Sequence, residues 1–339
     1  MTKRTFSALL LALCLLLCSC SVSAPGHTET TAPTEYSPTY SAAAAINHCV
    51  LEPDDNARLT YKDKIAYRTL MAAMLDRAGS AAPKVDTVTL GDLLDLMRES
   101  PYYYFLRSAE IDGDTVRFSY AYSAEEQQEM LDFIDRRILG IANYEASDDD
   151  NALDVILKIY LAVTHEMQYD HDRTDNKELD SPLFRYPGDE VYKALRDKKS
   201  LCYGFAYVMS NALLQRGIDC FRVYGLCTNR GDGHEWIIFR YGNQFYHCDP
   251  TWDRVSNNYA KLIHFGKTDR EREVDALDVK NFSSYHDPAY GTVECSDELF
   301  RIFRGINRFS YLGGHRYSMT DIKNKNYIFD SSDFSLVEQ

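Results

Sequence analysis

The sequence predicts an α+β fold in which a helix packs on an antiparallel sheet. A run with helical spacing begins at Cys202 and stops before Gly217. Residues 220–227 follow as an extended segment. Residues 234–241 and 244–249 then read as two strands joined at Gly242-Asn243, a dipeptide typical of tight hairpins. This order of one helix and three adjacent strands predicts an antiparallel sheet covered by the helix.

A mainly helical region is expected ahead of this block, over residues 46–145. Apolar residues there recur with helical period, and Ser147 is the candidate N-cap of the helix that follows. The expected elements are helices over 63–78, 90–97, 125–141 and 152–164 and a strand over 115–122. Residues 256–339 form a C-terminal extension whose role the sequence does not indicate. Within it, residues 259–265 could form a strand, and residues 329–337 are ambiguous.

The hairpin predicts that His234 and Asp249 lie on one face of the sheet. If Gly242-Asn243 is the turn, Tyr241 pairs with Gln244, and Asp249 lies one diagonal step from His234. Any loop of even length keeps the two side chains on the same face, with their Cβ atoms roughly 5 to 8 Å apart. A loop of odd length would place them on opposite faces.

Cys202 is expected at the first turn of its helix, where free N–H groups and the helix dipole favour a thiolate. A thiol becomes a useful nucleophile when a base lies beside it, and the base needs a partner that fixes its tautomer. Cys202, His234 and Asp249 supply these three groups in order. The alternatives are a buried core cysteine, a surface histidine and an aspartate that caps the turn at Pro250.

These stretches resemble the bacterial transglutaminase-like superfamily, whose members share a papain-like Cys-His-Asp arrangement. The resemblance rests on Cys-Tyr-Gly-Phe-Ala at Cys202, Gly-Asp-Gly-His-Glu-Trp around His234 and Asp-Pro-Thr-Trp-Asp from Asp249, and covers about residues 155–254. It implies a papain-like core over residues 146–255. Cys202 would then be the nucleophile, His234 the general base and acid, and Asp249 its orienting partner. Leu201 departs from the family, where a smaller or β-branched residue is commoner.

The resemblance also suggests residues around the reacting carbonyl. Gln168-Tyr169-Asp170 matches a family feature ahead of the catalytic helix, so Gln168 could assist the oxyanion hole beside the Cys202 N–H group, or be an ordinary loop glutamine. Trp236 and Trp252 follow His234 and Asp249. They could belong to the core or form a wall that keeps water out of the site.

The N-terminus has the pattern of an export signal. Lys3 and Arg4 precede an apolar run over residues 6–17 that is too short to span a bilayer comfortably. Leu17-Cys18-Ser19-Cys20 resembles a bacterial lipobox, so we expect residues 1–20 to be a lipoprotein signal and Cys20 to be lipidated. A secretory signal cut near Ala24 is the alternative. Residues 21–45, rich in Thr, Ser, Pro and Ala, are expected to be a flexible tether.

Composition restricts the possible partners. The formal charge of −14 argues against binding nucleic acid. His165 and His171 are six residues apart, with Asp170 between them, which does not match a zinc spacing, and no calcium loop is present. No cofactor or metal is therefore expected. The sequence does not decide whether the remaining cysteines are paired, although an exported protein permits disulfides.

The expected function is acyl transfer through a Cys202 thioester. We expect an exported, lipid-anchored enzyme on the outer face of the cytoplasmic membrane of a Gram-positive bacterium. Its substrate would be an amide bond of a peptide, protein or peptidoglycan-derived molecule, hydrolysed more readily than crosslinked because an exposed exported site meets water first. The alternative is a non-catalytic envelope module that binds peptide or glycan.

Overall fold

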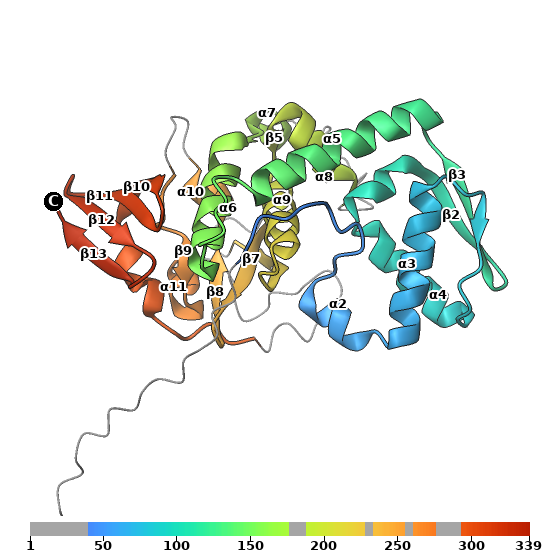
Figure 1. Ribbon diagram of the computed structural model, residues 1–339, viewed down its shortest axis with the longest axis horizontal. Helices are drawn as coiled ribbons and strands as arrows, with labels where there is room; N and C mark the ends of the chain where they lie inside the picture. The colour runs from blue at the N-terminus through green and yellow to red at the C-terminus, as the bar shows by residue number, and fades with distance from the viewer. Residues whose placement is uncertain (1–39, 176–187, 228–232, 255–259, 276–292) are drawn as a thin grey trace, which may run out of the picture. The chain divides into compact units, whose positions relative to one another are not determined.

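Helix α9 (Cys202–Gln215) lies on a four-stranded antiparallel sheet at the centre of the fold. The strand order is β6-β7-β8-β9, and Figure 1 shows α9 beside β7. The strands are β6 (Cys220–Leu226), β7 (Gly233–Tyr241), β8 (Gln244–Cys248) and β9 (Phe265–Lys267). The computed structural model describes residues 40–175, 188–227, 233–254, 260–275 and 293–339, which all belong to one compact unit. The α+β class with a helix on an antiparallel sheet is confirmed.

The local geometry of this centre follows from two glycines. Gly217 has φ +72°, a conformation that ends α9 one residue after its C-cap and that other residues adopt at a cost. Gly242 has φ +58° at the turn between β7 and β8. Tyr241 pairs with Gln244, so the predicted hairpin register is confirmed.

The two faces of the central sheet contact different parts of the core. Ile237 and Phe239 of β7 belong to the large apolar cluster that includes Phe205 of α9. The intervening residues Trp236 and Ile238 belong to a second cluster on the other face. Alternation along β7 therefore separates a helix-covered face from the face that also carries His234.

Helix α6 (Ala152–Glu166) packs against α9 and is buried over most of its length. All twelve residues from Leu153 to Thr164 are buried, including Lys158, whose Nζ donates to Asp150 over 2.6 Å. Its N-cap is Asn151 in a capping box with Asp154, so the expectation that Ser147 caps this helix is wrong. An N-cap must directly precede the first helical turn, and Ser147 lies too far upstream.

The N-terminal part is mainly helical, as predicted, but it also contains a small sheet. Capping boxes begin two of its helices, with Thr60 and Asp63 at one and Ser123 and Glu126 at the other. The helices are α2 (Pro53–Arg58), α3 (Tyr61–Leu75), α4 (Thr87–Arg98), η1 (Pro101–Phe105) and α5 (Ala124–Ala142). The strands are β1 (Ser80–Ala81), β2 (Leu106–Asp112) and β3 (Thr115–Tyr120), in the order β1-β3-β2.

A second four-stranded antiparallel sheet, which the sequence did not predict, completes the C-terminal part. Its strands, in spatial and chain order, are β10 (Ile306–Gly313), β11 (Arg316–Asp321), β12 (Asn326–Asp330) and β13 (Ser335–Glu338). The buried Asp154 of α6 accepts hydrogen bonds from Tyr317 and Ser331 and contacts His315. These contacts connect the extension to the core. The strand expected over 259–265 is only partly present, since Ala260 makes an isolated bridge and β9 begins at Phe265.

The predicted signal, Cys20 and most of the tether lie outside the described residues. Across the part of the chain that the structure describes, no helix has both the length and the apolar character needed to cross a membrane. No disulfide joins the six cysteines of that part, which are Cys49, Cys202, Cys220, Cys227, Cys248 and Cys295.

Gly204→Ala should destabilise the protein, whereas Gly91→Ala should not. A Cβ at Gly204 would lie 2.0 Å from Ser200 Oγ and 2.5 Å from Ser200 Cβ, so α9 would have to shift. We expect a loss of about 1–3 kcal/mol in the free energy of unfolding, measured by urea denaturation. A Cβ at Gly91 in α4 meets no atom within 4 Å, so that helical substitution should add up to about 1 kcal/mol. Equal stability of the two variants would contradict the close approach at Gly204.

Candidate active site

Cys202 is the first residue of α9 and is partly exposed. The chain reaches it through β5 (Lys199–Ser200), which pairs in parallel with β4 (Gln168–Tyr169). Leu201, the N-cap, supplies no side-chain cap to the helix. The N–H groups of the first turn therefore keep their capacity to stabilise a negative charge at the Cys202 sulfur or at an oxygen beside it.

His234 and Asp249 form a buried pair beside this thiol. Nε2 of His234 donates to Oδ2 of Asp249 over 2.6 Å, and the two residues are 4% and 0% exposed. The Cys202 thiol lies close enough to the His234 ring to help raise the pKa of His234. Because Nε2 is directed to Asp249, Nδ1 is the nitrogen left for the thiol. The structure thus brings together all three residues that the sequence singled out.

The pKa values of His234 and Asp249 are shifted in opposite directions. Burial alone would lower the pKa of His234, but the charge of Asp249 and the hydrogen bonds to Asp249 and Cys202 outweigh it and raise the pKa to about 10. Burial alone would raise the pKa of Asp249, but the charges of His234 and Arg272 hold it well below its usual value. The arrangement therefore favours an imidazolium next to an ionised carboxylate.

Asp249 accepts hydrogen bonds on both of its oxygens. It caps the short helix α10 (Pro250–Asp253), and its Oδ1 accepts from the backbone N–H groups of Thr251 at 3.1 Å and Trp252 at 3.3 Å. Its Oδ2 accepts from His234 and from Nη2 of Arg272, the latter at 2.8 Å. The turn role and the catalytic orientation considered for this aspartate are therefore compatible, because each uses a different oxygen.

Two tryptophans lie against the imidazole. The His234 ring stacks on Trp252 with centroids 4.7 Å apart and on Trp236 with centroids 5.9 Å apart. Trp236 is fully buried, whereas Trp252 is partly buried. Both tryptophans therefore belong to the apolar packing around His234, whereas their role as a wall that keeps water out stays a prediction.

His247, Asp269 and Cys295 form a second cluster, which the sequence analysis did not find. In the part of the chain that the structure describes, this is the group of three His, Cys, Asp or Glu side chains that could hold a metal ion. One possible ligand atom from each residue lies within 4.8 Å of those of the other two. The Trp236 indole donates to Nδ1 of His247 over 2.9 Å, so Nδ1 carries no proton and Nε2 donates to Asp269 at 2.7 Å. Burial lowers the pKa of His247. This neutral tautomer offers no lone pair to an ion, so the cluster fits a hydrogen-bonded support for Trp236 better than a metal site.

Gln168 and Tyr169, the further site residues that the resemblance suggests, lie at the edge of the site. Gln168 is exposed and lines an open groove with His165 and Lys199, among others. Its strand pairs with the two residues that precede Leu201, but its contribution to an oxyanion hole remains a prediction. Tyr169 is half-buried and contacts the ring of His171 edge-on, with centroids 5.1 Å apart.

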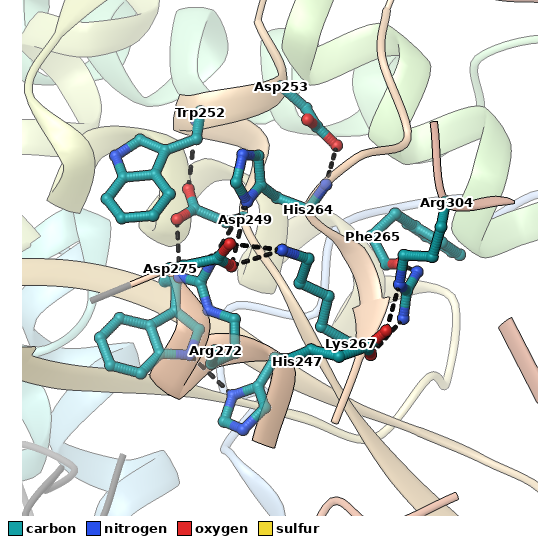
Figure 2. A network of polar contacts seen from close by, with 12 residues as sticks. His247, Asp249, Trp252, Asp253, His264, Phe265, Lys267, Arg272, Asp275 and Arg304 are labelled. Atoms are coloured by element: carbon teal, nitrogen blue, oxygen red, sulfur yellow. Dashed lines mark hydrogen bonds and ion pairs between the residues drawn. The ribbon is translucent and has the colours of Figure 1, made fainter. Parts of the chain in front are cut away.

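Arg272 is the main residue that the sequence analysis missed. It lies on α11 (Asp269–Val274), is fully buried and donates to Asp249, 23 residues earlier (Figure 2). An arginine in an acidic, polar stretch looks like a surface residue in the sequence. No local spacing relates it to Asp249, so only the tertiary structure shows the contact.

Comparison with known proteins finds one family model and several solved structures similar to this chain. Residues 141–250, which include Cys202, His234 and Asp249, match the model of the transglutaminase-like superfamily. No curated protein shows a significant match. Among seven similar solved chains, a TGase crystal structure is 13% identical with a TM-score of 0.31, over 62% of this chain and 52% of that one. A candidate cysteine protease from Cytophaga hutchinsonii is 16% identical with a TM-score of 0.26, over 39% and 43%. The chain thus spans about half the length of each.

His234 should make stability depend on pH in the alkaline range. Its pKa is about 10 in the folded protein against 6.5 ordinarily, so its contribution is fully present below pH 6.5 and is lost as the pH rises through 10. We expect the difference in unfolding free energy between wild type and His234→Ala to shrink over this range by an amount on the order of 2–4 kcal/mol. Urea denaturation at pH 6, 8 and 10 measures it.

The matched control is His165→Ala. Burial lowers the pKa of His165, so this residue is uncharged across the same range. Its removal should leave the slope between pH 7 and pH 10 unchanged. A constant difference between wild type and His234→Ala would contradict the raised pKa of His234.

Proposed function

We propose that this chain is a member of the transglutaminase-like superfamily, whose model residues 141–250 match, and that it is a thiol-dependent acyl-transfer enzyme acting on amide bonds. The observation that carries the proposal is the contact of the His234 imidazole with both the Cys202 thiol and the buried Asp249 carboxylate. Binding alone needs no such array, so this contact favours catalysis over a purely adhesive module.

Each residue has a definite part in the proposed reaction. The Cys202 thiolate attacks the amide carbonyl and forms a thioester, while protonated His234 gives its proton to the leaving amine. Asp249 holds the His234 ring so that Nδ1 faces the sulfur. The backbone N–H group of Cys202, with Gln168 as a further candidate, would stabilise the oxyanion. In the second half, neutral His234 takes a proton from the incoming nucleophile, which attacks the thioester.

We propose that water is the usual acceptor, which makes the enzyme a peptidase or amidase rather than a crosslinking enzyme. Cys202 is partly exposed at the end of α9, so water can reach the thioester. The substrate class that follows is an amide of a peptide, a protein or a peptidoglycan-derived molecule. No cofactor takes part in this scheme.

We further propose that the enzyme works outside the cytoplasmic membrane, anchored there through a lipid on Cys20. The support is the sequence pattern of a positively charged start, a short apolar run and Leu17-Cys18-Ser19-Cys20. The lipid would be the only contact with the membrane, and residues 21–45 would let the enzyme reach its substrates.

Cys202 should react with iodoacetamide well below neutral pH. At pH 6 we expect it to be alkylated about tenfold faster, or more, than in His234→Ala, because the imidazolium stabilises the thiolate. Mass spectrometry of the domain from residue 38 onward measures the rate at each cysteine.

The other cysteines provide internal controls for this experiment. Burial raises the pKa of Cys49, Cys220, Cys248 and Cys295, so these four should react slowly at pH 6 in both proteins. An ordinary thiol profile at Cys202, unchanged by His234→Ala, would sink the catalytic proposal. A peptide- or glycan-binding module would then be the better account.

Lipid attachment at Cys20 is tested separately in a Gram-positive host. Cells fed an alkyne-labelled fatty acid should label wild type and Cys18→Ala but not Cys20→Ala, because only Cys20 follows Ser19 at the expected cleavage point. Release of an unlabelled wild-type protein cut near Ala24 would instead show a plain secretory signal.

A further inference from the structure

We propose that Arg272 is a positioning residue of this active site, which acts on catalysis by holding the Asp249 carboxylate towards His234. The inference rests on the proposed function and goes beyond it, because Arg272 lies outside the matched residues 141–250 and comes from a different part of the chain. It assigns a role in the reaction to the C-terminal extension.

The first argument is the hydrogen bonding at Asp249. Oδ2 of this carboxylate accepts from Nη2 of Arg272 at 2.8 Å and from Nε2 of His234 at 2.6 Å, so the two donors share one oxygen. All three side chains are buried, Arg272 and Asp249 completely. A charge-assisted contact in such a site is strong and well oriented, because water does not compete with it.

The second argument is the placement of the guanidinium between the tryptophans. Its central carbon lies 4.9 Å from the ring centroid of Trp252 and 5.2 Å from that of Trp236, the same two rings that contact His234. Stacking on aromatic rings suits a guanidinium better than an ammonium. The two indoles therefore restrain the base and the arginine together.

The third argument is that polar contacts hold α11 in place. Figure 2 shows Arg272, Asp275, Lys267 and Arg304 in this network. Nη1 of Arg272 donates to Asp275 at 3.2 Å, and Asp275 accepts from Lys267 of β9 at 2.6 Å. Glu271 of α11 accepts from Arg304 at 2.7 Å. These contacts fix the helix, so Arg272 reaches Asp249 from a rigid support.

Arg272 also sets the electrostatic balance of the site. Its fixed positive charge faces Asp249, and removing it should raise the pKa of Asp249 and of His234 beside it. The other ionisable groups around Asp249 and Arg272 are Cys202 of α9, Tyr160 of α6, His247 and Cys248 of β8, Asp253 of α10, His264 before β9, Lys267 of β9 and Asp275 after α11. Among them Lys267 is a lasting cation, but its ammonium is bound to Asp275 rather than to Asp249.

The test compares Arg272→Met, which removes the charge and keeps an unbranched chain, with Arg272→Lys, which keeps a charge. Arg304→Met is the control, because it removes an arginine that contacts α11 but touches neither Asp249 nor the indoles. We would measure Cys202 alkylation by iodoacetamide from pH 4 to pH 10, together with thermal stability. Arg272→Gln is the second neutral variant if Arg272→Met does not fold.

In Arg272→Met and Arg272→Gln, the pH at which the alkylation rate of Cys202 falls on the acid side should rise by about one pH unit. Arg272→Lys should lie closer to wild type, and Arg304→Met should lose stability without moving this pH. A residue with a merely structural role would change stability alone. An unchanged pH of this fall in folded Arg272→Met or Arg272→Gln would overturn the proposal.

A second readout separates this proposal from the proposed function. The pKa of His234 is followed by NMR in protein with labelled histidine, starting from about 10 in wild type. It should rise in Arg272→Met and stay constant in Arg304→Met. If Cys202 of the wild type showed the alkylation profile of an ordinary thiol, only the proposed enzymatic function would be contradicted. The His234 titration would still decide the role of Arg272. A His234 pKa that does not respond to Arg272→Met would overturn that role.

Discussion

The site depends on the hydrogen bonds that surround the ionised, fully buried carboxylate of Asp249. A lone carboxylate is strongly disfavoured away from water, so it persists there only when donors surround it. Here the donors are two backbone N–H groups of α10, the imidazole of His234 and the guanidinium of Arg272. They come from three separate segments of the chain, and satisfying one charge therefore holds β7, α10 and α11 together.

The properties of His234 follow from this constraint. Because Nε2 is committed to Asp249, Nδ1 is the nitrogen left for the thiol, and the buried charge next to the ring keeps the imidazolium stable. Trp236 and Trp252 stack on the same imidazole ring. Trp236 is itself oriented by the neutral His247, which connects a second buried histidine to the geometry of the first.

Buried charges connect distant segments elsewhere in the molecule too. Arg222 on β6 contacts Glu52 at 3.2 Å and Glu99 at 2.6 Å and lies 3.9 Å from the ring centroid of Tyr207, which connects the sheet to the N-terminal helices and to α9. Asp154 connects α6 to the C-terminal sheet in the same way. Such contacts contribute to uniqueness of the arrangement more clearly than to stability, because desolvation offsets much of the attraction.

The sequence by itself determined the start of α9 at Cys202, the hairpin register and hence the placing of His234 and Asp249 on one face. These follow from helical and strand periodicities and from a turn, all of which act over a few residues. The cap of α6 by Asn151 and the hairpins of the C-terminal sheet are also local, but the sequence analysis did not identify them. The contact of Arg272 with Asp249 was decided only by the tertiary structure, because it joins distant segments and the need to satisfy a buried charge leaves no regular spacing along the chain.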